Sequence, residues 1–112
     1  MDDSRILRGT ELRYALTLQL HQHGPATISE LIEALTWHGF LIVGNPPKSV
    51  SDALRWEMGY YRAIRVGRGK YAPGEMPRST EYRITRRVVA LREQARRIRY
   101  EAGNSDDDRE IA

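Results

Sequence analysis

Cysteine is absent from this chain of 112 residues, and so are several other features that would point directly to a function. Without cysteine the chain forms no disulfide and offers no thiolate to a metal, which suits a reducing compartment. No apolar run approaches the ~18 residues that cross a membrane. The N-terminal MDDSRILRGT lacks the apolar segment of a secretory signal. We therefore expect a cytoplasmic protein with one domain and an appendage.

Patterns typical of enzymes and metal proteins are missing as well. His21 and His23 are two residues apart, about 200° around a helix, so they do not share an ion, and neither they nor His38 belong to a ligand pattern. Gly67-Arg68-Gly69 precedes no helix and is not a phosphate loop. Carboxylates are scattered, and no Ser/His/Asp order suggests a nucleophile. The sequence predicts no catalysis, no metal and no cofactor.

Charge is unevenly distributed along the chain, although the formal net charge is only +3. Residues 1–47 hold 3 cations and 5 anions, net −2, and residues 100–112 hold 1 and 5, net −4. Residues 48–99 hold 14 cations and 5 anions, net +9. A block this basic favours a polyanionic partner, since phosphate neutralisation releases condensed counterions. For residues 78–99 a solvated helix face explains the charge equally well.

Apolar spacing and capping signals predict four helices in an α+β, mostly helical chain. They span residues 10–23, 27–38, 47–59 and 80–101, with Thr10 and Thr27 as caps and Glu30 completing a capping box. Residues 40–43 predict an edge strand. The expected organisation is a flexible N-terminus at 1–9, a domain at 10–76, a C-terminal helix at 77–102 and a disordered acidic tail at 103–112.

A short basic hairpin directly follows the third predicted helix, in the sequence Ile64-Arg65-Val66-Gly67-Arg68-Gly69-Lys70-Tyr71. Its glycines supply the positive φ of a tight turn. Alternation places Ile64, Val66 and Tyr71 toward the core and the cations outside. In the helix, Glu57 falls near the buried side and is expected to pair with Arg62 or Arg65, while Trp56 and Tyr60 are expected to pack at the core edge.

The segment from Leu12 to Pro73 resembles the winged helix-turn-helix class, and most closely its HARE-HTH type. The matching pieces are Gly24-Pro25, Gly44-Asn45-Pro46-Pro47, Val50-Ser51-Asp52-Ala53-Leu54 and the hairpin. Together they cover about 60 residues, and their combination in order is more specific than any single piece. The resemblance implies three helices with a small antiparallel β-wing, in the order α-α-β-α-β-β, associated with DNA or chromatin-like complexes. The eight residues between the second and third helices exceed the usual three or four.

We predict that this chain is a DNA-binding protein, a small bacterial transcriptional regulator associated with the nucleoid. The third helix enters the major groove of double-stranded DNA, and the wing lies on the backbone. Arg55 contacts a base edge, and Lys48 and the two serines meet phosphate. The three cations of the wing either cross the phosphate backbone or enter the minor groove. The predicted DNA-binding residues are Lys48, Ser49, Ser51, Arg55, Arg65, Arg68 and Lys70. The alternative is a winged-helix module that binds another protein and makes no direct DNA contact.

The fourth predicted helix carries an apolar seam with steps of four and three residues. Its members are Ile84, Val88, Leu91, Ala95 and Ile98. Such a seam either pairs with the same helix of a second chain or folds back on its own domain. We predict the first arrangement, a homodimer through this helix, because a two-fold operator needs two wings.

Overall fold

The structure, a computed structural model, describes residues 4–111, with side chains for residues 4–102. Three short helices precede the long C-terminal one: α1 (Thr10–His23), α2 (Ile28–Trp37) and α3 (Pro46–Gly59). Side chains cap the first turns of α2 and α3. The predicted capping box of α2 is confirmed, because Thr27 Oγ1 accepts from the Glu30 amide at 3.1 Å and Glu30 Oε1 from the Thr27 amide at 2.8 Å. Asn45 caps α3. The N-cap of α1 is a glycine, so Thr10 is not the cap that the sequence predicted.

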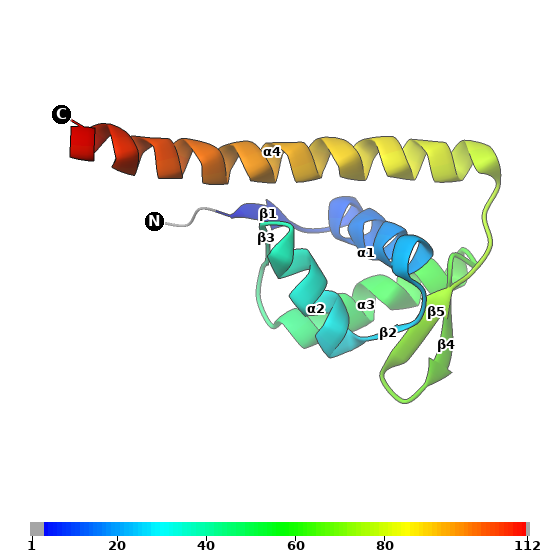
Figure 1. Ribbon diagram of the computed structural model, residues 1–112. Coiled ribbons are helices and arrows are strands. Elements are labelled where there is room, and N and C mark those ends of the chain that lie inside the picture. The colour runs from blue at the N-terminus through cyan, green and yellow to red at the C-terminus, as the bar shows by residue number, and fades with distance from the viewer. Residues whose placement is uncertain (1–3, 112) are drawn as a thin grey trace.

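Five short strands, the first of which precedes α1, form two sheets. The strands β1 (Arg5–Leu7) and β3 (Phe40–Ile42) pair in parallel. The other sheet is antiparallel with the order β2-β5-β4, built from β2 (Ala26–Thr27), β4 (Ala63–Gly67) and β5 (Lys70–Pro73). In Figure 1 the β4–β5 hairpin projects from the end of the molecule at which α4 begins. The described chain is α+β and mostly helical, as the sequence predicted.

The long helix α4 (Arg78–Ile111) lies across α1 (Figure 1). A helix of 34 residues is about 51 Å long, which explains the 53 Å longest dimension of the molecule. The sequence predicted an end near residue 102 and a disordered tail at 103–112. The helix instead continues to Ile111, because one glycine at position 103 costs only about 1 kcal/mol. Residue 112 and the side chains of this segment lie outside the described residues.

The apolar core is centred on α1. Leu12, Leu16 and Leu20 of this helix belong to the same buried cluster as Leu31 and Leu35 of α2. Their four-residue spacing places them along one helix face, as the sequence predicted. Every element packed against α1 is therefore held in place by the same buried surface.

The seam of α4 completes this core rather than lying free. Ile84, Val88, Leu91 and Ala95 are all buried within the single chain, and Ile98 is partly buried. The seam therefore follows the fold-back alternative, since its side chains are already covered by the chain's own domain. Homodimerisation stays a prediction, and while α4 is docked it would need a surface other than this one.

The N-terminus also differs from expectation. Residues 5–7 were predicted to be flexible, but they pair with β3, and Leu7 is fully buried. The pairing is parallel, so its partner lies more than thirty residues away and leaves no local signal. The predicted flexibility of residues 1–3 lies outside the described residues. In the described part of the chain, no helix combines the length and apolar character needed to span a bilayer.

Candidate nucleic-acid interface

A four-residue stripe runs along the exposed side of α3: Lys48, Asp52, Trp56 and Tyr60. Lys48 Nζ lies 3.0 Å from Asp52 Oδ2, and Arg55 Nη1 lies 4.0 Å from Asp52 Oδ1. The carboxylate thus sits between the two cations that the sequence assigned to DNA. These ion pairs are exposed, so each contributes little to stability and opens readily when a stronger anion approaches.

Two serines of the predicted DNA-binding set are less accessible than the cations. Ser49 is half-buried, and its hydroxyl donates to the carbonyl of Val43 at 3.0 Å. It therefore holds the loop between β3 and α3 in place. Ser51 is also half-buried, one residue from the inward-facing Val50. Within α3, the accessible members of the set are Lys48 and Arg55.

The β4–β5 hairpin presents its three cations to solvent. Arg65, Arg68 and Lys70 are exposed, and no salt bridge joins any of them to an acidic side chain among the described residues. The turn takes its shape from Gly69, at φ 64°. The Gly69 carbonyl also accepts from the Ile28 amide at 3.0 Å, which anchors the turn to the start of α2. These charges therefore stand on a supported loop.

The outer face of the hairpin is more apolar than the sequence predicted. Ile64 and Val66 are half exposed rather than pointing to the core, and only Tyr71 is buried as expected. The ladder is irregular between Arg65 and Gly67, where the register shifts. Strict alternation fails because the hairpin extends beyond the edge of the domain, where neither face has a helix to cover it.

A buried ion pair fixes the start of the hairpin to α3. Arg62 donates through Nε to Glu57 Oε1 at 2.9 Å and through Nη2 to Oε2 at 2.8 Å. Thr17 of α1 donates its hydroxyl to the same carboxylate, which is 0 % exposed. The hydrogen bond to Glu57 raises the pKa of Arg62. The predicted pairing of Glu57 with Arg62 is thus confirmed, and it joins α1, α3 and the residue that precedes β4.

Sequence reasoning missed an aromatic surface at the end of α3. Trp56 is 62 % exposed, and Tyr60 is exposed beside it, so the predicted packing at the core edge is wrong. The guanidinium of Arg13 lies 5.4 Å from the centre of the Trp56 ring, and Arg62 lies 4.5 Å from that of Tyr60. A hollow of about 630 Å³ opens here along α3. The four-residue spacing of this stripe was the signal that would have indicated a shared exposed face.

The cations of α4 behave differently, because many of them bind groups of their own chain. Arg87 lies 3.1 Å from Glu11, which also receives Arg5 at 3.1 Å. Arg96 and Arg97 both pair with Glu93. Three arginines of this helix thus share two carboxylates, whereas no cation of the β4–β5 hairpin forms a salt bridge among the described residues. Among the described residues, no three His, Asp or Glu side chains are grouped closely enough to hold a metal ion.

Comparisons of the chain with protein-family models, curated proteins and solved structures gave no match.

Proposed function

We propose that residues 10–76 form a winged helix-turn-helix domain that binds double-stranded DNA, and that the chain acts as a small transcriptional regulator. Support comes from the element order, because α1, α2, β3, α3, β4 and β5 occur in the order that the resemblance implies, with the two-residue strand β2 added between α1 and α2 and β1 before α1. The β4–β5 hairpin begins four residues after α3 ends and is tied to it by the ion pair of Glu57 and Arg62. The helix α3 and the β4–β5 hairpin therefore bind DNA as one rigid unit.

The observation that carries the proposal is the exposed charge of Arg65, Arg68 and Lys70, none of which forms a salt bridge among the described residues. Three cations on a supported, exposed turn neutralise phosphates at little cost, because none has to break a salt bridge within the described chain. In α3, Arg55 is the residue that reads a guanine edge through two hydrogen bonds. Lys48 meets phosphate. Asp52 holds both side chains along the helix and releases them as phosphate takes its place.

This division of labour is testable by binding selected and shuffled duplexes to the protein and its variants. Arg55→Ala should relax the sequence preference at one base-pair position, a loss of about 1–3 kcal/mol of discrimination. Arg68→Gln should weaken binding to all duplexes alike. Asp52→Asn should tighten binding to shuffled DNA, because it removes a carboxylate that repels phosphate. If Arg55→Ala leaves the preference intact, the assignment of α3 to the major groove is refuted.

A second candidate function is supported by the half-exposed Ile64 and Val66 on the hairpin. Adjacent apolar side chains at an exposed edge are typical of protein interfaces. A winged-helix module that docks a protein through this edge would lose its partner when Val66 is changed to Lys. DNA binding should survive Val66→Lys or become tighter, because the substitution adds a cation beside Arg65. The two functions therefore predict opposite effects of one substitution.

A further inference from the structure

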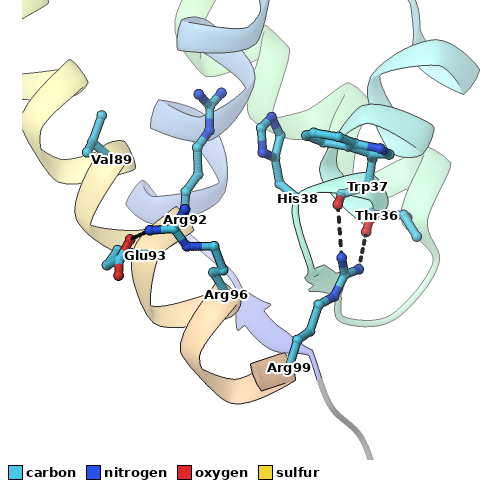
Figure 2. Close-up of a pocket in the computed structure, with 8 residues that line it drawn as sticks. All are labelled: Thr36, Trp37, His38, Val89, Arg92, Glu93, Arg96 and Arg99. Carbon is cyan, nitrogen blue, oxygen red and sulfur yellow. Dashed lines mark hydrogen bonds and ion pairs between the residues drawn. The ribbon is translucent and has the colours of Figure 1, made fainter. Parts of the chain in front are cut away.

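A hollow of about 870 Å³ lies between the C-terminal end of α2 and the middle of α4, away from α3. Figure 2 shows the residues that line it: Thr36, Trp37, His38, Val89, Arg92, Glu93, Arg96 and Arg99. Three of them are arginines and only one is acidic. The arrangement is made by docking α4 on the domain, since Gly39 lets the helix approach so closely that a Cβ there would be 3.2 Å from that of Ala95.

Two of the three guanidinium groups have partners within the protein. Arg99 donates to the carbonyls of Thr36 at 2.9 Å and Trp37 at 3.2 Å in the last turn of α2. The Thr36 carbonyl also accepts from the Gly39 amide at 2.9 Å. Figure 2 shows both bonds of Arg99, and it shows Arg96 joined to Glu93. The single carboxylate of the hollow is thus already engaged.

Arg92 is different, because its partners are incomplete. Its Nη1 donates to the neutral side chain of Gln22 at 3.0 Å, but Nε and Nη2 are buried and have no hydrogen-bond partner. No carboxylate among the described residues forms a salt bridge with it. Burial lowers its pKa, which reflects the cost of holding the charge there. Such a group is stabilised by any anion that reaches it.

The same chain shows which anion this geometry fits. In the pair of Arg62 and Glu57, it is Nε and Nη2 that grip the two oxygens of one carboxylate. These adjacent donors form a planar fork that matches a carboxylate. Arg92 offers the same two atoms with no oxygen in front of them. A carboxylate would complete at Arg92 the pairing already present at Arg62.

Apolar surface beside Arg92 indicates what the carboxylate is attached to. The indole of Trp37 is 75 % exposed, and Val89 is half exposed on the facing helix. His38 lies between Trp37 and Arg92 (Figure 2), and its ring meets the indole edge-on at 5.0 Å. Flat apolar surface next to a cation suits an aromatic ring that carries a negative charge.

We propose that this hollow binds a small aromatic carboxylate, with the carboxylate on Nε and Nη2 of Arg92 and the ring against Trp37. The bound molecule then bridges α2 and α4. This site is independent of the DNA-binding face, and it holds whether or not the proposed function is correct. Both nitrogens are buried, so binding requires that the side chains covering Arg92 move aside.

Benzoate is the probe that tests this proposal. In a Trp56→Phe background, Trp37 is the only indole, because the chain has two tryptophans. Titration with benzoate should change its fluorescence with a dissociation constant on the order of 1 mM or below. Benzyl alcohol, which lacks the charge, and inorganic phosphate, which lacks the ring, should bind at least about tenfold more weakly. Calorimetry on the unaltered protein should rank the affinities of the three compounds in the same way, with benzoate binding most tightly.

Variants separate the site from general charge effects. Arg92→Gln should weaken benzoate binding by about tenfold or more, whereas Arg83→Gln, on the same helix outside the hollow, should not change it. Trp37→Ala should also weaken binding, measured by calorimetry, and it removes only an exposed side chain. Benzoate should raise the pKa of His38, followed by NMR, because a nearby anion favours the imidazolium. Absence of benzoate binding, equal binding of phosphate, or full affinity in Trp37→Ala would overturn the proposal.

Discussion

Removing the carboxylate of Glu57 should destabilise the fold more than any change at the surface ion pairs. The side chain of Glu57 is 0 % exposed and that of Arg62 is 11 % exposed. In Glu57→Ala the guanidinium stays buried without its counter-charge, which costs about 3–5 kcal/mol. The two charge-assisted hydrogen bonds, at roughly 1.5–3 kcal/mol each, give a similar total of about 3–6 kcal/mol. That is a large part of the ~5–15 kcal/mol stability of a typical domain.

Urea unfolding followed by circular dichroism measures this loss. Lys48→Ala is the control, because it breaks a pair whose side chains are 74 % and 48 % exposed, and it should cost at most about 0.5 kcal/mol. The double variant Glu57→Leu with Arg62→Leu should recover most of the loss, since no charge is then left unpaired. A cost below about 1 kcal/mol for Glu57→Ala, or equal costs for Glu57→Ala and Lys48→Ala, would refute this reasoning.

Three further predictions concern packing and pH. Gly74→Ala should destabilise strongly, because a Cβ there would lie 2.1 Å from a main-chain oxygen, whereas Gly59→Ala meets nothing within 4 Å and should be neutral or slightly stabilising in thermal unfolding. Leu91→Ala should cost about 2–5 kcal/mol in urea unfolding and Val89→Ala under about 1 kcal/mol; equal costs would contradict the docking of α4. Burial, with nearby positive charge, lowers the pKa of His38 from 6.5 to about 4. As the pH falls, the unfolded chain therefore binds the His38 proton before the folded chain does, so the free energy of unfolding should decrease as pH drops from 6.5 toward 4. His38→Gln should flatten that part of the stability profile. An NMR titration midpoint of His38 near 6.5 would contradict this prediction.

Local signals predicted most of the helices and the hairpin, because each of these depends on neighbours in sequence. The capping box of Thr27 and Glu30 and the pairing of Glu57 with Arg62 involve residues at most five apart. The parallel pairing of residues 5–7 with β3 was missed because it joins distant segments. The apolar periodicity of α4 indicated a buried face, but it does not show whether the surface that packs on this face belongs to the same chain or to a second copy.

Exposure was the other property that pattern alone did not supply. Alternation in the hairpin predicted that Ile64 and Val66 point inward, but both side chains lie beyond the buried core and are half exposed. Trp56 was assigned to the core edge from its residue type, although its spacing from Lys48 and Asp52 places it on their exposed stripe. The unpartnered donors of Arg92 could not be foreseen, because they result from how α4 docks on the end of α2.

The salt dependence of DNA binding tests the central claim most directly. Fluorescence anisotropy with a labelled duplex at about 50 and 200 mM salt gives the number of phosphates neutralised. The double variant Arg68→Gln with Lys70→Gln should reduce the slope of log K against log salt by about 1.8, at roughly 0.9 per contact. Arg97→Gln, which removes an exposed arginine of α4, should leave the slope unchanged. Binding that ignores salt, or an equal loss of slope in Arg97→Gln, would contradict DNA binding through the hairpin.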